Sequence, residues 1–212
     1  MVMIFRWTLR LTGGAIIAAL LMAVLAYFLA ARSLPNYTKT LKVEGITASV
    51  EIVRNNANVP HIFGETDTDV FFGLGYAHAQ DRLWQMTMLR RTAQGRLSEV
   101  FGKRTLSVDT LLRRLDIYRL ASVSVASQDA RTSDALSAYA AGVNMRITEI
   151  NNRSLGRGAP EMFLFGAPIS PWRPADSLAV TKLMALQLSG HLQDEVLRAR
   201  TSLVLPDEAR LS

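Results

Sequence analysis

The sequence contains no cysteine and only three histidines. Without a thiol, the chain cannot supply a cysteine nucleophile, a CxxC redox pair, a thiolate zinc site or a disulfide bond. The histidines, His61, His78 and His191, show neither HxH nor HExxH spacing, so the sequence does not favour a zinc site. Serine hydrolase signatures are also missing. No GxSxG elbow and no SxxK motif occurs, and neither Ser98 nor Ser189 has a neighbouring base in sequence.

Acidic residues are absent from the first 33 positions. Residues 11–31 carry no charge at all, and a helix of this length, at about 1.5 Å per residue, can cross the ~30 Å hydrocarbon layer of a membrane. Arg6 and Arg10 precede the apolar run, which predicts a cytoplasmic N-terminus. The chain is therefore expected to export everything that follows this segment.

Residues 1–33 fit either a signal anchor or a cleaved signal peptide. Ala30 and Ala31 offer only a weak cleavage site, and the apolar run is long for a signal peptide. We therefore favour an uncleaved anchor that spans the membrane at about residues 11–31. Residues 34–212 would then face the periplasm from the inner membrane, or would be periplasmic if the segment is cleaved.

Basic residues are in only slight excess outside this segment. The net charge is +6, but without Arg6, Arg10 and Arg32 the chain has 21 basic residues against 18 acidic ones. These charges are interleaved and do not form a basic patch, so nucleic acid is not an expected partner. About 180 exported residues are enough to build a real hydrophobic core.

Hydrophobic patterning predicts an α+β, mainly helical protein with a short β element near its start. Apolar and polar residues alternate over 41–53, with a turn at Glu44-Gly45, and VPHIFGE continues as another extended piece. Helices are expected over 67–94, with a Thr or Asp cap and Gly95 as terminator, over 107–126, from Thr132 or Ser133 to 152, and over 174–205. A Gly- and Pro-rich loop separates the last two.

The helix beginning at Asp67 contains the residues that look most like an active site. His78 and Asp81 are three positions apart, and Arg82 follows at four from His78, so a base and its orienting acid could share one face. No hydroxyl nucleophile lies on that face. The helix is apolar nearly all round, which is typical of a central buried helix. We therefore interpret the three polar residues as scaffold groups that satisfy one another.

Long stretches of the chain resemble the start of the α chain in the penicillin acylase family of N-terminal-nucleophile hydrolases, which includes acyl-homoserine-lactone acylases. They are VEIVRNNANVPHIFGETDTDVFFGLGYAHAQDRLWQMTMLRRTAQGRLSEVFG, DALSAYAAGVNMRI, PISPWRPADSLAV and MALQLSGHLQDEVLRAR, within about residues 41–205. The resemblance implies the mainly helical α-chain portion of an αββα sandwich. It also implies a zymogen-like precursor that cuts itself into α and β chains.

The resemblance places the catalytic serine at the N-terminus of the β chain, with its own amino group as base. No catalytic residue is therefore expected on this chain, whose residues 34–212 would end before the spacer and the β chain. The implied partners are that β chain, as a heterodimer, and a small acylated amide such as a penicillin or an acyl-homoserine lactone. No organic cofactor is implied.

Two contributions of the α chain carry over by position. A structural Ca²⁺ ligand of the family falls on Glu195; spacing alone would give Asp194-Glu195 little weight as a metal site, because Ca²⁺ needs several more oxygens. The methionine, arginine and phenylalanine that line the acyl pocket of penicillin-G enzymes fall on Ala185, Leu188 and Ser189. None of the three identities is kept, which favours an aliphatic acyl group over an aromatic one.

The turn before VPHI has residues that differ from those usual in the family, but they allow the same turn. The usual acid and glycine are replaced by Asn55 and Asn58, and asparagine accepts the left-handed conformation, so the turn should persist.

Two hypotheses follow for the whole chain. The first is the α-chain portion of a membrane-anchored acylase. The second is a catalytically inactive anchored domain that uses the same helices for structure or binding.

Overall fold

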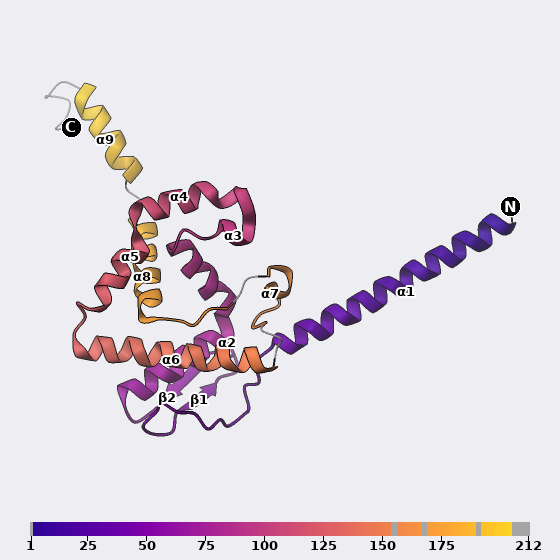
Figure 1. Ribbon diagram of the computed structural model, residues 1–212, viewed down its shortest axis with the longest axis horizontal. Coiled ribbons are helices and arrows are strands. Elements are labelled where there is room, and N and C mark those ends of the chain that lie inside the picture. The colour runs from indigo at the N-terminus through magenta and orange to yellow at the C-terminus, as the bar shows by residue number, and fades with distance from the viewer. Residues whose placement is uncertain (1, 154–156, 167–168, 190–191, 205–212) are drawn as a thin grey trace.

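The computed structural model describes residues 2–153, 157–166, 169–189 and 192–204. Within these ranges a helical body carries one small β hairpin, and two helices project from it (Figure 1). The elements follow in the order α1 (Val2–Ser33), β1 (Glu51–Arg54), β2 (Pro60–Phe63), α2 (Asp67–Ala93), α3 (Ser98–Phe101), a 3-10 turn (Gly102–Thr105), α4 (Leu106–Leu115), α5 (Ile117–Val125), α6 (Ala130–Arg153), α7 (Glu161–Leu164), α8 (Pro174–Leu188) and α9 (Leu192–Val204).

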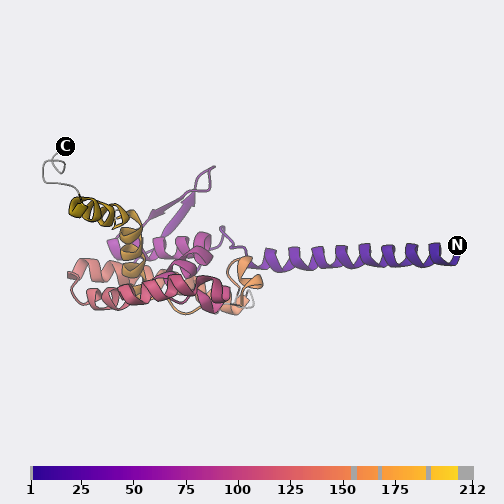
Figure 2. The same cartoon turned by 90° about the horizontal axis from the view of Figure 1, so that it is seen from above.

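Helix α1 extends away from the body along almost its whole length (Figures 1 and 2). Residues 3–33 are long and apolar enough to cross a membrane, and none of their most apolar window is buried. A signal sequence at an N-terminus has the same properties. The structure therefore confirms the apolar helix, while its role as anchor or signal stays a prediction.

The β hairpin lies later in the chain than the alternating pattern predicts. Residues 41–50 contain no strand, and β1 pairs antiparallel with β2, with Ile52 opposite Ile62. The chain bends at Glu44-Gly45 as expected, with Gly45 at φ 92°, but no strands pair across this bend. The tight turn of the hairpin falls at 55–59, where Asn58 adopts φ 59°. The Asn55 side chain accepts hydrogen bonds from the backbone N–H groups of Ala57 and Val59, both at 3.0 Å. The prediction that two asparagines support this turn is confirmed.

Helix α2 begins and ends where its caps predict. The Thr66 hydroxyl accepts a hydrogen bond from the Asp69 N–H at 3.2 Å, and Gly95 terminates the segment with φ +61°. One feature is not visible in the pattern, since Arg82 leaves helical geometry with φ −138° and ψ 24°. Helix α2 is therefore kinked in its middle, directly after Asp81.

The main core forms where α2 and α6 lie side by side. Two glycines make their close approach possible. A Cβ on Gly75 would lie 2.1 Å from the carbonyl oxygen of Tyr139, and one on Gly142 would lie 1.9 Å from that of Phe72. Any larger residue at either position would push the helices apart. The buried residues that fill this core are Ala79, Leu83, Met86, Ala140, Val143, Ile147, Ile150, Met162 and Trp172.

A second core cluster joins the end of α2 to α4, α5 and α8. The predicted single helix over 107–126 is wrong, because Asp116 adopts φ 54° and divides it into α4 and α5. The turn lets Leu112 and Ile117 face one cluster together with Ala179 of α8. The start of α6 also differs from prediction: Asp129 caps it by accepting from the Thr132 N–H at 2.8 Å.

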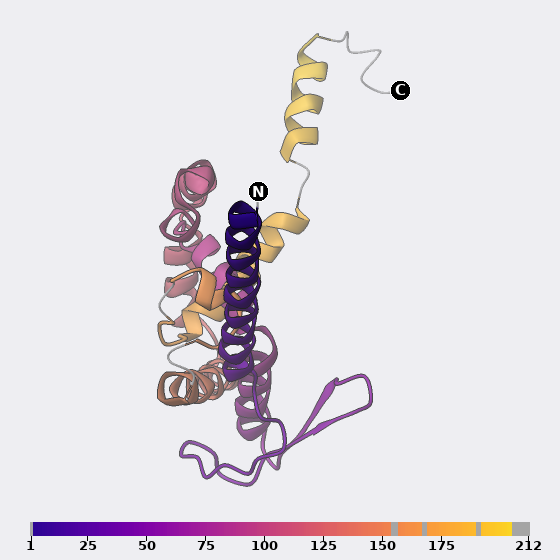
Figure 3. The same ribbon diagram turned by 90° about the vertical axis from the view of Figure 1, so that its right-hand side faces the viewer.

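The last predicted helix is likewise divided, into α8 and α9. Helix α8 begins as expected with Pro174 in its first turn, and the Asp176 carboxylate accepts from the Arg173 N–H at 2.8 Å. Helix α9 extends away from the body (Figures 1 and 3). Helix α8 ends at Leu188, because Ser189 leaves helical geometry with φ −82° and ψ 25°.

Candidate functional site

The three polar residues at the middle of α2 do not satisfy one another, so that prediction is wrong. Asp81 instead binds Arg54 of β1, whose Nη2 and Nη1 atoms donate to its two carboxylate oxygens at 2.9 and 3.0 Å. The Tyr37 hydroxyl also donates to Asp81 at 3.2 Å, and its ring lies 4.1 Å from the Arg54 guanidinium carbon. Asp81 therefore ties the segment after α1 and the hairpin to α2.

His78 and Arg82 have other partners. The Nδ1 atom of His78 lies 3.0 Å from the Tyr139 hydroxyl, and the two rings meet edge to face. His78 keeps an exposed edge, but its partial removal from water lowers its pKa below the usual value, which favours the neutral imidazole. Arg82 donates to Gln85 at 3.2 Å. The interpretation of this stretch as scaffold is consistent with the structure, although the partners come from other elements.

The predicted acyl-pocket residues lie together at the end of α8. Ala185, Leu188 and Ser189 are all exposed, and Leu188 is 80% accessible. The Ser189 hydroxyl donates to the carbonyl oxygen of Leu186 at 2.9 Å, so it satisfies the local backbone. None of the three lines the apolar cavity between α2, α6 and α8 that is described below. Ala185, Leu188 and Ser189 form an open surface, which we call the ledge. A substrate pocket at the ledge would need residues from another chain segment on its opposite side.

Glu195 lies in the first turn of α9 and is exposed. It accepts a hydrogen bond from Nη1 of Arg198 at 3.2 Å. Across the described residues, no group of three or more His, Cys, Asp or Glu side chains could hold a metal ion. These residues do not by themselves fit calcium, whose usual six to eight oxygen ligands would have to come mostly from elsewhere. His191 lies outside the described residues.

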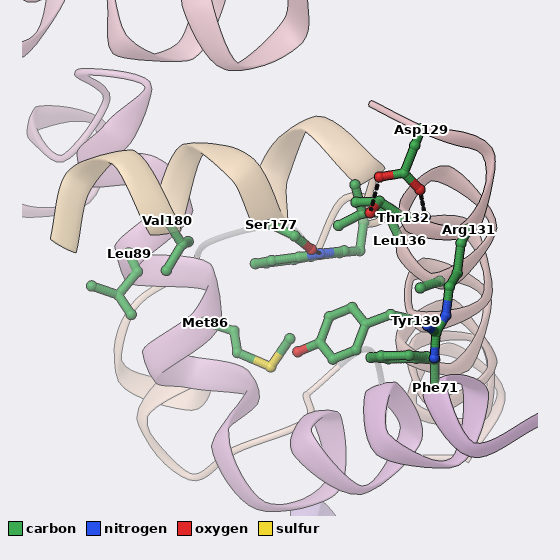
Figure 4. A pocket seen from close by; sticks show the side chains of 12 residues that line it. Phe71, Met86, Leu89, Asp129, Arg131, Thr132, Leu136, Tyr139, Ser177 and Val180 are labelled. Carbon is green, nitrogen blue, oxygen red and sulfur yellow. Dashed lines mark hydrogen bonds between the residues drawn. The ribbon is translucent and has the colours of Figure 1, made fainter. Parts of the chain in front are cut away.

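An apolar cavity of about 690 Å³ opens between α2, α6 and α8 (Figure 4). Its side chains come from all three helices, from the turn before α6 and from the loop before α8: Phe71, Met86, Leu89, Asp129, Arg131, Thr132, Ala135, Leu136, Tyr139, Trp172, Ser177 and Val180. Their positions are more than a hundred residues apart at most, so no local pattern could have grouped them. The only signal was the apolar stripe of α2 that includes Phe71 and Leu89.

Most polar groups that line the cavity are hydrogen-bonded within the protein. The Trp172 indole N–H donates to the Ser177 hydroxyl at 2.9 Å (Figure 4), and Asp129 caps α6. Burial raises the pKa of Tyr139 to about 12, so its hydroxyl is neutral at physiological pH. Two of its hydroxyls are hydrogen-bonded: the Tyr139 hydroxyl lies 3.0 Å from Nδ1 of His78, and the Thr132 hydroxyl donates to Asp129 at 3.0 Å. The cavity can accommodate apolar groups.

A buried carboxylate joins three elements at the far end of α8. Asp176 is 1% exposed and accepts from the Tyr118 hydroxyl of α5 at 2.9 Å. Arg90 of α2 lies 3.5 Å away and also donates to the carbonyl oxygens of Ser170 and Pro171 at 3.1 and 3.0 Å. These bonds hold α8 in place and thereby set the position of the ledge at its end.

Comparison with known proteins identifies the class to which this helical arrangement belongs. The sequence profile of the penicillin amidase family matches residues 49–211. The chain is 36% identical over 157 residues to penicillin acylase 2 proenzyme from Pseudomonas sp. (strain SE83), covering 73% of this chain and 19% of that protein. It is 35% identical over 157 residues to acyl-homoserine lactone acylase QuiP from Pseudomonas syringae pv. tomato, covering 74% and 19%.

A solved structure agrees with the sequence comparisons. Thermostable penicillin G acylase from Alcaligenes faecalis matches with a TM-score of 0.63 and 25% identity, over 73% of this chain and 81% of that one. The chain belongs to the penicillin amidase family, and the predicted resemblance is confirmed. It spans about a fifth of the length of the curated relatives that it matches.

Proposed function

We propose that this chain is the α-chain portion of an acylase that hydrolyses the amide bond of an N-acyl substrate. The family match over residues 49–211 carries the proposal. The substrate is a penicillin-like side chain or an acyl-homoserine lactone, as the names of the relatives suggest. The nucleophile is an N-terminal serine of a β chain made from the same precursor, activated by its own amino group.

The part of this chain closest to the chemistry is the end of α8. Ala185, Leu188 and Ser189 contribute one wall of the acyl pocket, and the β chain supplies the other. The exposure of this ledge supports the arrangement, since an aliphatic side chain such as Leu188 at 80% accessibility lacks a covering surface within the described chain. Small and aliphatic side chains there suit an aliphatic acyl group.

Two further features belong to the same proposal. Glu195 supplies one carboxylate to a structural Ca²⁺ ion whose remaining oxygens come from the β chain. Addition of a chelator should then lower the melting temperature of the complete protein, and a Glu195→Gln variant should not respond; an equal response in both would remove Glu195 from the site. Helix α1 holds the acylase at the inner membrane, facing the periplasm, or directs its export if it is cleaved.

Mass spectrometry of the complete exported protein tests the proposal. We expect two chains, one of them with a free N-terminal serine, and hydrolysis of at least one penicillin or acyl-homoserine lactone. Serine→Ala at that N-terminus should abolish both processing and hydrolysis. A single unprocessed chain without amidase activity would support instead an inactive, anchored structural or binding domain.

A further inference from the structure

Helix α7 lies beside the end of α1 that joins the body, as all three views show (Figures 1, 2 and 3). The last turn of α1 is packed there, because Ser33 is 1% exposed, whereas the large apolar residues earlier in α1 are open. A membrane crossed by α1 would therefore meet the body first on the side that carries α7. The side chains on that side decide whether the body also contacts lipid.

Apolar side chains on this side have no cover within the described chain. Leu164 of α7 is 81% accessible, and Leu34, directly after α1, is 65% accessible. Next to Leu164, the Phe165 ring stacks on Trp84 of α2 with centroids 5.5 Å apart and meets Phe101 of α3 edge to face at 5.3 Å. These ring contacts fix α7 to α2 and α3. An exposed aliphatic residue on such a support is suited to the boundary between lipid headgroups and acyl chains.

Cations lie next to these apolar side chains. The 3-10 turn directly after Phe101 carries Lys103 and Arg104, which are both exposed and have no hydrogen-bond or ion-pair partner among the described residues. Glu161 of α7 is an exposed acid, whereas Glu99 is already paired with two arginines. This side of the body therefore has an excess of positive charge, which anionic lipid headgroups attract.

We propose that this side rests on a lipid bilayer with anionic headgroups, through a docking surface that consists of Leu34, Phe101, Lys103, Arg104, Leu164 and Phe165. Leu164 inserts between the headgroups, and Lys103 and Arg104 contact lipid phosphates. Lipid is favoured over the β chain as occupant because the surface adjoins a helix long and apolar enough to cross a membrane. The proposal rests on the anchor role proposed for α1 but not on the acylase reaction.

Docking in this way gives the body one orientation on the membrane. Helix α1 alone holds the body near lipid but leaves it free to turn, so a second contact is needed to fix the orientation. Helix α9 extends from the side of the body opposite α1 (Figures 1 and 2). With the docking surface on lipid, α9 faces away from the membrane, where the β chain can reach it.

The test uses the complete protein and the absence of cysteine from this chain. Leu164→Cys allows a fluorescent label to be placed on the docking surface. Ser127→Cys is the matched control, because Ser127 is exposed and precedes α6, whose 24 residues run from there toward the side where α1 joins (Figure 1). The protein without either substitution gives the background from any cysteine on the β chain.

Each labelled protein is reconstituted into vesicles of phosphatidylglycerol and phosphatidylcholine that include lipids with a nitroxide quencher just below the headgroup. We expect the label at position 164 to be quenched at least about twofold more than the label at position 127. Three changes should each reduce this excess by at least about half: Lys103→Gln combined with Arg104→Gln, salt at about 0.5 M, and vesicles of phosphatidylcholine alone. Arg119→Gln combined with Arg131→Gln removes two exposed cations elsewhere and should leave the excess unchanged.

Equal quenching at the two positions would overturn the proposal, and so would an excess at position 164 that responds neither to salt nor to lipid charge. If position 164 reacts with the label only after denaturation, the β chain covers this surface and the proposal is wrong. A mature chain that begins after α1, detected by mass spectrometry, would also overturn it. The salt and lipid comparisons need no charge variant, so they decide the question even if the Lys103 and Arg104 substitutions prevent folding.

The outcome is separable from that of the proposed function, because processing and amide hydrolysis are measured on the same samples. Hydrolysis without excess quenching would contradict the docking surface and leave the acylase proposal intact. Excess quenching without processing or hydrolysis would support the docking surface and contradict the acylase proposal.

Discussion

Single buried residues hold the elements of this chain together over long sequence distances. Asp176 of α8 contacts Tyr118 and Arg90, which lie 58 and 86 positions earlier in the chain. Burial lowers the pKa of Arg90 from its usual value, although the neighbouring Asp176 opposes the shift. A charged pair at this depth stabilises the fold only while both partners are present, because an unpaired buried charge is costly.

We expect Asp176→Ala to reduce the free energy of unfolding by about 3–5 kcal/mol, because it leaves the Arg90 guanidinium buried without a counter-ion. Urea unfolding of the complete protein followed by circular dichroism measures the loss. Asp67→Ala is the control, since its pair with Arg131 is exposed and should contribute below about 1 kcal/mol. Equal losses in the two variants would contradict the role given to Asp176.

The proposed acyl pocket makes a second prediction at the scale of a residue. Leu188→Phe adds bulk to the ledge at the end of α8, so kcat/KM for long acyl chains should fall at least about tenfold relative to short ones. Leu164→Phe on α7 is the matched control, because Leu164 is similarly exposed at 81%. An unchanged chain-length profile in Leu188→Phe would place the acyl pocket elsewhere.

At the scale of elements, the contact between α2 and α6 decides the fold. Gly75 and Gly142 bring a backbone carbonyl of the opposite helix within about 2 Å of where their Cβ atoms would lie. The same contact positions the Tyr139 ring against His78 and places Tyr76 beside Glu149. The apolar cavity and the hydrogen bond from Tyr76 to Glu149 both depend on this close approach.

Replacement of Gly142 by Ala should therefore destabilise the protein by at least about 2 kcal/mol, since the new methyl group meets backbone rather than a flexible side chain. The urea midpoint of the complete protein measures the effect. Gly166→Ala serves as the control, because a Cβ there has no neighbour within 4 Å. A wild-type midpoint for Gly142→Ala would show that α2 and α6 can separate at little cost.

For the molecule as a whole, the prominent feature is apolar surface outside α1 that nothing in the described chain covers. Large apolar side chains are exposed on body helices and on the projecting α9, among them Leu111, Leu120 and Val123 on α4 and α5 and Leu203 and Val204 on α9. Isolated surface leucines are ordinary, but several on neighbouring turns indicate a surface that is covered in the complete protein.

We expect residues 34–212 expressed alone to bind a hydrophobic dye such as ANS and to self-associate, because this surface is then open to water. Production together with the remainder of the precursor should suppress both effects. Light scattering and dye fluorescence measure them. A monomeric fragment that unfolds cooperatively and binds no dye would contradict the prediction.

Short-range features of the chain were predictable from sequence. The Thr66 cap, the stop at Gly95, the Asn55–Asn58 turn and the start of α8 at Pro174 each depend on residues within four or five positions, and all are confirmed. The family could also be recognised from the sequence, because its motifs run continuously over α2. The predicted element boundaries were wrong where a single residue left helical geometry, as at Asp116. They were also wrong where a predicted strand found no pairing partner, as in residues 41–50.

The amino-acid sequence by itself determined the absence of thiol chemistry, the apolar first helix, the helical class and the family. Only the tertiary structure decided the partners of the polar side chains. Spacing suggested that His78 and Asp81 serve each other, yet they bind Tyr139 and Arg54. Backbone caps act within one turn, whereas a polar side chain takes the partner that folding brings within about 3 Å.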